Sequence, residues 1–109
     1  MWFEHIPAAI TVCDNKGVIV FMNDKSIETF SNDGGAKLIG SSVFGCHEHE
    51  ANEQILDFLE HNKTNIYTIE KNGKKKLIYQ APWLENGQVA GIVELSVELP
   101  DIIPNFIRK

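Results

Sequence analysis

Residues 46–50, Cys-His-Glu-His-Glu, carry side chains that readily ligate metal ions. Thiolate, imidazole and carboxylate groups all bind zinc or iron, so Cys46, His47 or His49 could hold a metal or a haem iron. The alternative is a loop that leads into a helix, with Cys46 buried and the glutamates favourable at the helix N-terminus. Both interpretations stay open. We include Cys46 and His47 among the residues expected to line a cavity, and we predict no dedicated metal site.

No catalytic motif accompanies this cluster. The sequence contains no glycine-rich phosphate loop, no Gly-x-Ser-x-Gly elbow and no His-Glu-x-x-His zinc motif. A nucleophile and base formed by Cys46 and His47 would have to face each other, which neighbours in sequence rarely do. We therefore expect a binding protein and not an enzyme.

The elements that must position such groups are marked by turns. Asn72-Gly73 and Asn86-Gly87 each lie between strand-like runs and predict type I′ hairpins, and residues 14–17 predict a third turn. The runs between these turns are rich in Val, Ile, Tyr and Thr, which favours strands. The predicted strands are 9–14, 18–22, 65–71, 75–83 and 88–99.

Residues 23–64 have a helical character. Asn23 and Asp24 can cap a helix, and the apolar spacing from Ala51 to Leu59 predicts an amphipathic helix over 49–62. This order predicts an α+β fold, a five-stranded antiparallel sheet with helices inserted between strands 2 and 3 and packed on one face. One domain is expected over 1–109, with a core at about 3–98 and a C-terminal tail over 99–109.

Composition narrows the functional classes. The 109 residues carry a net charge of −5, which argues against nonspecific nucleic-acid binding. No apolar stretch reaches the ~20 residues of a membrane helix, and the N-terminus does not resemble a signal peptide. Two cysteines without a disulfide framework indicate free thiols. The expected protein is cytoplasmic, with no membrane or nucleic-acid partner.

The order and spacing of several short motifs resemble a PAS domain over nearly the whole chain. These motifs are Ile6-Pro7 and residues 9–14 (AITVCD), 15–17 (NKG), 18–23 (VIVFMN), 38–40 (LIG) and 87–94 (GQVAGIVE). Residues 38–47 also resemble a PAS subgroup in which a Cys-His segment follows "LIG" and usually precedes Pro, where this chain has Glu48. The resemblance implies a sensor fold with a cavity between the helices and the sheet. PAS domains bind small molecules, haem or flavin there, and others serve only as dimerisation modules.

Light-driven chemistry is not expected. Light-oxygen-voltage domains, a flavin-binding PAS branch, carry an Asn-Cys pair just after the glycine of this segment, where the chain has Ser42-Val43. A photoactive flavin adduct is therefore not predicted, while haem or non-covalent flavin stays open as a cofactor.

The hairpin turns predict which residues share a sheet face. Pairing around Asn86-Gly87 places Tyr79 opposite Glu94, and by resemblance to PAS domains their face points inward. The predicted cavity residues are then Thr11, Cys13, Cys46, His47, Leu77, Tyr79, Ile92 and Glu94. Ile66, Thr68 and Ser96 are expected on the same face.

The opposite face is predicted to be too apolar for water on a stable monomer. Its predicted residues are Ile10, Val12, Tyr67, Ile69, Ile78, Val93, Leu95 and Val97. Few residues precede Ile6, too few for a covering helix. We therefore expect a second copy to cover this face as a twofold homodimer.

The sequence as a whole predicts a PAS sensory or regulatory module. It would bind a small ligand between sheet and helices and signal through dimer contacts or a signalling protein partner. One alternative is a ligand-free dimerisation or docking module. A second is a haem or metal sensor that uses Cys46 and His47.

Overall fold

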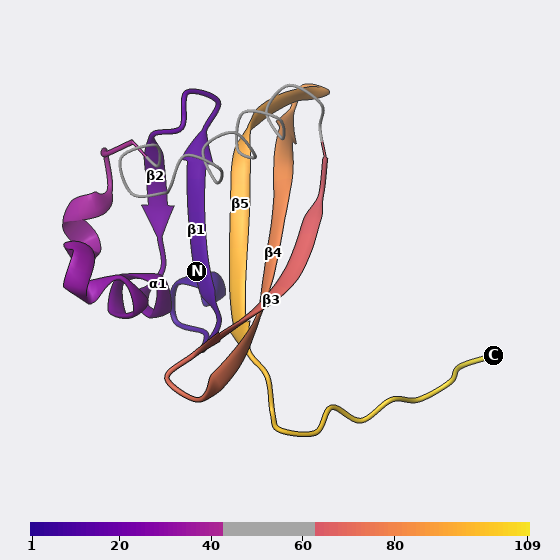
Figure 1. Cartoon of the computed structure of the whole chain (residues 1–109). Coiled ribbons are helices and arrows are strands. Elements are labelled where there is room, and N and C mark those ends of the chain that lie inside the picture. The colour runs from indigo at the N-terminus through magenta and orange to yellow at the C-terminus, as the bar shows by residue number, and fades with distance from the viewer. Residues whose placement is uncertain (43–62) are drawn as a thin grey trace.

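The sheet contains five antiparallel strands in the order β2-β1-β5-β4-β3 (Figure 1). The structure is a computed structural model that describes residues 1–42 and 63–109. The strands are β1 (Ala9–Asp14), β2 (Ile19–Met22), β3 (Asn65–Lys71), β4 (Lys74–Glu85) and β5 (Gln88–Glu98). The predicted strands and the antiparallel sheet are confirmed, and every predicted strand end agrees within two residues.

The predicted turns have the expected backbone. Asn72 and Gly73 adopt φ values of 54° and 77°, and Asn86 and Gly87 adopt 53° and 79°. Two successive positive φ values are what a type I′ turn requires, and Asn and Gly adopt them at least cost. At the third turn, the Asp14 carboxylate accepts backbone hydrogen bonds from Lys16 (2.9 Å) and Val18 (3.0 Å).

One face of the sheet packs against short helical segments that follow β2. These are α1 (Asp24–Thr29), η2 (Ser31–Asp33) and η3 (Gly35–Leu38). Ile27, Phe30 and Leu38 from this region pack on a buried cluster of Cys13, Ile19, Met22 and Ile92. We call the sheet face that carries Cys13 and Ile92 the inner face and its reverse the outer face. The helix predicted over 49–62 lies outside the described residues.

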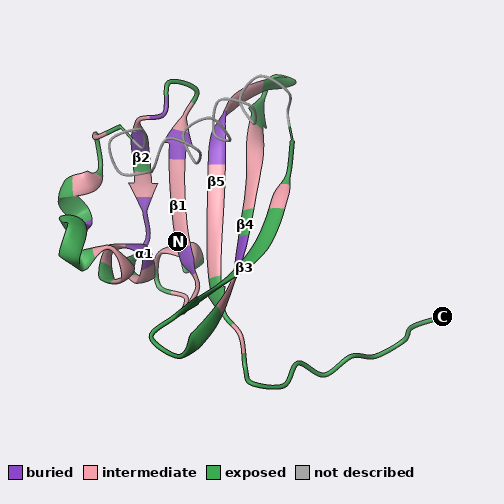
Figure 2. Cartoon of the chain, in the orientation of Figure 1, coloured by how far each residue is buried: buried purple, intermediate pink, exposed green. Residues whose placement is uncertain are grey.

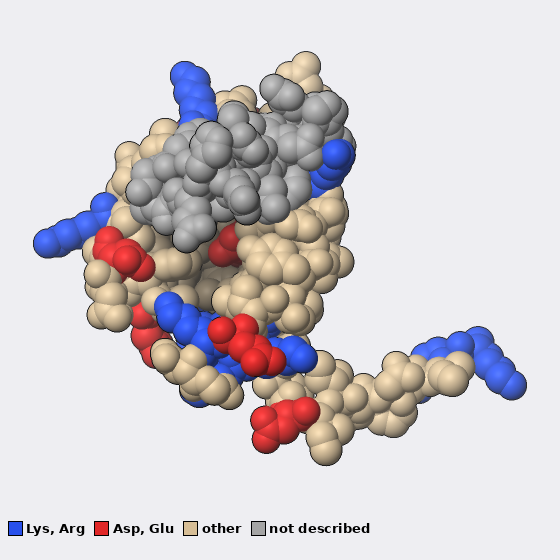
Figure 3. Space-filling model, viewed as in Figure 1, with Lys and Arg blue, Asp and Glu red and all other residues tan. Residues whose placement is uncertain are grey.

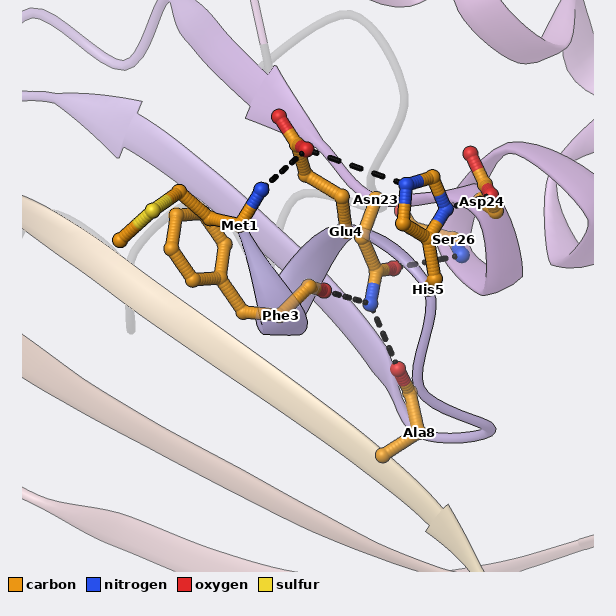
Figure 4. A network of polar contacts seen from close by, with 8 residues as sticks. All are labelled: Met1, Phe3, Glu4, His5, Ala8, Asn23, Asp24 and Ser26. Carbon is orange, nitrogen blue, oxygen red and sulfur yellow. Dashed lines mark hydrogen bonds and ion pairs between the residues drawn. The ribbon is translucent and has the colours of Figure 1, made fainter.

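Asn23 joins three parts of the fold (Figure 4). It is 1% exposed, and its Oδ1 accepts hydrogen bonds from the backbone N–H groups of Ile10 (2.9 Å) and Ser26 (3.0 Å). Its Nδ2 donates to the carbonyls of Phe3 (2.9 Å) and Ala8 (2.8 Å). Asn23 therefore caps α1 and holds both α1 and the N-terminal segment against β1.

The N-terminal segment forms a short turn, η1 (Trp2–Glu4), and covers one edge of the outer face. The Phe3 ring contacts Phe21 of β2 edge-on at 5.5 Å, and Phe21 pairs with Val12. The N-terminal ammonium bonds the Glu4 carboxylate at 2.8 Å, and this contact lowers the pKa of Glu4. This turn therefore lies over β2 at the edge of the outer face.

The predicted pairing of β4 with β5 is wrong beyond the hairpin. Leu84 pairs with Val89 as predicted, but a bulge between Trp83 and Leu84 then shifts the register, so that Trp83 pairs with Gly91 and not with Ala90. The indole of Trp83 donates its Nε1–H to the Cys13 carbonyl at 3.2 Å, and a Cβ built at Gly91 would collide with both groups. The indole therefore requires the glycine as its direct neighbour, which the shifted register supplies.

Relative to the predicted pairing, the bulge moves the β4 side chains from Trp83 back toward Lys74 to the other face, because side chains alternate along a strand. The β3–β4 register itself is as predicted, so β3 moves with β4. Leu77 and Tyr79, predicted inward, lie on the outer face with Ile66 and Thr68. Tyr67, Ile69 and Ile78, predicted outward, lie on the inner face.

Charged groups gather near the β3–β4 hairpin, where Glu98 lies within ion-pair distance of Lys74 (3.8 Å) and Lys25 (4.0 Å). Figure 3 shows basic and acidic side chains side by side at the lower edge of the molecule. After β5 the chain runs away from the sheet, and residues 100–109 are exposed (Figures 1 and 2). Among the described residues, no helix is long and apolar enough to cross a membrane.

Candidate ligand site on the inner face of the sheet

A row of four polar residues crosses the inner face, one from each of four adjacent strands. Thr11 of β1 pairs with Glu94 of β5, Glu94 pairs with Gln80 of β4, and Gln80 pairs with Asn65 of β3. We call these four residues the polar row. All four are partly buried.

Hydrogen bonds link three members of the polar row, Asn65, Gln80 and Glu94. The Gln80 amide donates its Nε2–H to Glu94 Oε2 at 2.7 Å, and Asn65 Nδ2 lies 3.5 Å from Gln80 Oε1. A carboxylate only accepts hydrogen bonds, so the Gln80 amide must direct its nitrogen at Glu94. This orientation leaves the Gln80 carbonyl facing Asn65. Along these three residues each hydrogen bond therefore points the same way, because Asn65 donates to Gln80 and Gln80 donates to Glu94.

At one end, the polar row reaches the helical side of the domain. The Thr11 hydroxyl lies 2.6 Å from the hydroxyl of Ser26 on α1, and Ser26 is fully buried. This bond couples β1 to α1.

The rows on either side are mostly apolar. On one side, Cys13, Ile92 and Pro82 pair across β1, β5 and β4. On the other side, Ile78 pairs with Tyr67, whose hydroxyl lies 3.5 Å from Gln80 Nε2. A flat molecule lying on the sheet would thus meet a polar stripe bordered by aliphatic surface.

The pKa of the Tyr67 phenol is affected by its position next to this stripe. Burial and then the nearby Glu94 charge raise the pKa of the Tyr67 phenol, while the hydrogen bond from Gln80 opposes the rise. Tyr67 therefore stays protonated and can both donate and accept a hydrogen bond.

Cys13 lies on the inner face but is poorly suited to covalent chemistry. Its side chain is 5% exposed, and burial raises the pKa of the thiol. A raised pKa keeps the reactive thiolate scarce at neutral pH. Cys13 thus serves as part of the apolar core beside Ile92.

The predicted cavity residues divide into three groups. Thr11, Cys13, Ile92 and Glu94 lie on the inner face, Leu77 and Tyr79 lie on the outer face, and Cys46 and His47 lie outside the described residues. Within the described ranges, no cluster of His, Cys, Asp and Glu could hold a metal ion.

The sequence interpretation missed Gln80, Asn65 and Tyr67, because the bulge exchanges the faces of β3 and β4. A signal was present, since Pro82 cannot donate to a strand ladder and is usually found at edges or bulges. Between the described parts of the inner face, Figure 3 shows a hollowed surface below the grey atoms, with acidic atoms at its edge.

Comparison with solved structures establishes the fold. The PAS domain of an HTR-like protein from Haloarcula marismortui has a TM-score of 0.62 at 16% identity, covering 89% of this chain and 85% of that one. A dual PAS-heme oxygen sensor, the Aer2 receptor from Vibrio cholerae, has a TM-score of 0.62 at 14% identity, covering 85% and 95%.

The chain has the fold of a PAS domain. The strand order β2-β1-β5-β4-β3 and the segments α1 to η3 after β2 are the parts of that fold that the structure describes. The polar row thus lies on the helix-facing side of a PAS sheet.

A third match places this PAS fold inside a longer protein. The VqmA dimer of Vibrio cholerae has a TM-score of 0.71 at 17% identity, and the match covers 91% of this chain but only 49% of VqmA. The chain therefore spans about half of that protein. No protein-family model matches the chain, and no curated protein is similar enough in sequence to match.

Proposed function

We propose that the chain is a PAS sensory module that binds a small ligand on the polar row and signals to a second copy through its outer face. The observation that carries this proposal is the polar row itself, which crosses an otherwise mostly apolar inner face. A sheet built only for packing would carry apolar side chains along the whole of that face. The outer face, in contrast, exposes a line of apolar side chains.

The polar side supports ligand binding. Placing Glu94, Gln80 and Asn65 on an inner sheet face costs desolvation that aliphatic side chains would avoid. Their mutual hydrogen bonds offset part of this cost, but each group keeps further donors or acceptors that need partners. A bound polar molecule supplies such partners and would offset the remaining cost.

The apolar side supports a protein contact. Next to the polar row, but pointing outward, Ile10, Leu95, Tyr79 and Ile66 pair in one line across β1, β5, β4 and β3. We call these four residues the apolar row. Ile66 is 58% exposed and Tyr79 is 37% exposed. A contiguous apolar surface of this kind marks an interaction site.

The two rows are linked through the backbone. Glu94 and Leu95 are neighbours in β5, and Gln80 and Tyr79 are neighbours in β4. A ligand that pulls on Glu94 or Gln80 therefore also moves the residues that would form the contact between copies. Such a ligand shifts the signalling state by its difference in affinity for the two arrangements.

Native mass spectrometry of the freshly purified protein tests this proposal. We expect a dimer that carries a small-molecule mass, and we expect the double variant Glu94→Leu, Gln80→Leu to lose that mass while remaining folded by circular dichroism. The matched control is Glu85→Gln, at the exposed end of β4, which should keep the ligand. A wild-type sample that binds no small molecule, even from cell extract, would contradict the ligand-binding function.

The outer face supports a second candidate function, a docking module that needs no ligand. The apolar row can hold a second copy whether or not the polar row is occupied. This candidate predicts an unliganded dimer that the Glu94→Leu, Gln80→Leu variant leaves unchanged. Haem or flavin as the bound molecule stays a prediction, and the absorption spectrum of the same sample tests it.

A further inference from the structure

Glu94 determines what kind of molecule the polar row can hold. It is the one charged member of the row, and among residues 1–42 and 63–109 no cation forms an ion pair with it. Its hydrogen-bond partner within the described residues is the Gln80 amide, which donates to Oε2. A partly buried carboxylate with one neutral donor retains a strong demand for further N–H or O–H groups.

The neighbouring polar groups on the sheet do not meet this demand. The Thr11 hydroxyl, opposite Glu94, bonds the Ser26 hydroxyl, and the Tyr67 hydroxyl accepts from Gln80 Nε2 at 3.5 Å; within the described residues neither hydroxyl bonds Glu94. The Glu94 carboxylate would repel an anionic ligand, while a cationic or N–H-bearing ligand would form a charge-assisted hydrogen bond with it.

The rows that flank the polar row constrain the shape. Ile92 and Ile78 are buried on either side, at 6% and 5% exposure. These buried side chains leave little room beside the stripe, which favours a small flat ligand over a bulky one. A ring lying along the row would direct its substituent toward Glu94.

We propose that the ligand is a small flat molecule with a cationic or N–H-rich group, such as an amidine or an amino-substituted heteroaromatic ring, bound by the Glu94 carboxylate. This inference rests on the proposed ligand-binding function and adds the chemical class of the ligand. Gln80 acts as a positioning residue, because its amide holds Glu94 in place.

Three probes with the same ring test the inference. Benzamidine carries a cationic N–H donor group, benzamide a neutral one and benzoate an anionic acceptor. We expect titration of the ¹⁵N-labelled protein to show benzamidine shifting the amide signals of β4 and β5 around the polar row. Its affinity should exceed that of benzoate by at least about tenfold, the effect of one charge-assisted hydrogen bond.

The variant Glu94→Gln keeps the size of the side chain and removes its charge. We expect it to weaken benzamidine binding by at least about tenfold, whereas the matched control Glu85→Gln leaves binding unchanged. A dispersed amide spectrum for both variants would show that they fold. Equal binding of benzoate and benzamidine, or unchanged benzamidine binding by Glu94→Gln, would overturn the inference.

The outcomes that would reject this ligand class can be told apart from those that would reject ligand binding altogether. If benzoate binds at the polar row as well as benzamidine does, the site takes ligands and only the assigned chemical class is wrong. If none of the three probes shifts the signals of β4 and β5, and native mass spectrometry finds no bound small molecule, both the ligand-binding function and this inference are wrong.

Discussion

At the scale of single residues, the charge of Glu94 has a spectroscopic reporter. The chain contains two tyrosines, Tyr67 on the inner face and Tyr79 on the outer face. Burial raises the pKa of Tyr67, and the Glu94 carboxylate raises it further, because a nearby negative charge disfavours the phenolate. A change at Glu94 should therefore be visible in the titration of Tyr67.

The variant Tyr79→Phe leaves Tyr67 as the single tyrosine of the chain, so the tyrosine absorbance reports its ionisation alone. We expect ultraviolet titration to give a pKa above the unperturbed value of about 10, and Glu94→Gln to lower it. Glu85→Gln is the control and should leave the titration in place. If Glu94→Gln does not move the pKa of Tyr67, the two side chains do not share the inner face.

The same shift has a consequence for stability. In the pH range between the unfolded and folded pKa of Tyr67, the folded state keeps a proton that the unfolded state has lost. The folded state then binds more protons, so the free energy of unfolding decreases as pH rises through this range. Because Glu94→Gln lowers the pKa of Tyr67 in the folded state, the free energy of unfolding of the variant should decrease less over this pH range than that of the wild type.

At the scale of elements, the β4–β5 bulge decides which side chains form the site. The shift between Trp83 and Leu84 brings Gly91 next to Trp83, and the indole then reaches the Cys13 carbonyl on β1. This contact joins three adjacent strands, β4, β5 and β1, by a single side chain. The register that creates the polar row is therefore maintained by the space at Gly91.

Replacing Gly91 by alanine should destabilise the fold strongly. Gly91 does not have a positive φ, so the added methyl group acts through collision with the Cys13 carbonyl and the Trp83 indole. We expect a loss of at least about 3 kcal/mol, the upper range for overpacking a well-packed site. Urea denaturation followed by circular dichroism measures it.

Gly73→Ala is the matched control for this substitution. A Cβ at Gly73 meets open space, but φ there is 77°. The substitution should therefore lower the free energy of unfolding only by the backbone strain, about 1–2 kcal/mol. If the Gly91 variant proves no less stable than the Gly73 variant, the close approach at Gly91 does not hold the register.

Much of the fold followed from local chemistry in the sequence. Asn-Gly pairs fixed both hairpin turns, and β-branched runs fixed the strands, because these signals lie within a few residues. The faces of β3 and β4 did not follow, since the bulge depends on Trp83 meeting Cys13, a contact between residues far apart in the chain. Glu94 and Thr11 were placed correctly on the inner face, because that assignment came from the resemblance to PAS domains and did not depend on the pairing of β4 with β5.

At the scale of the whole molecule, a single strand, β3, can show which face of the sheet forms the contact between two copies. Ile66 and Ile69 both belong to β3, where all residues but Asn65 are exposed (Figure 2). The pairing with β4 places Ile66 on the outer face beside Tyr79 and Ile69 on the inner face. The two isoleucines therefore make a matched pair for locating the contact between copies.

We expect Ile66→Glu to weaken the dimer and Ile69→Glu to leave it intact. The first substitution replaces about 2 kcal/mol of apolar burial by a charge that faces its own copy across a twofold axis, so dissociation should increase by at least about tenfold. Sedimentation velocity over a concentration series measures the dissociation constant. Because both side chains are at least 38% exposed in the single chain, neither change should unfold the domain. If Ile69→Glu disrupts the dimer and Ile66→Glu does not, the contact uses the inner side of β3, and the outer face is free for a different partner.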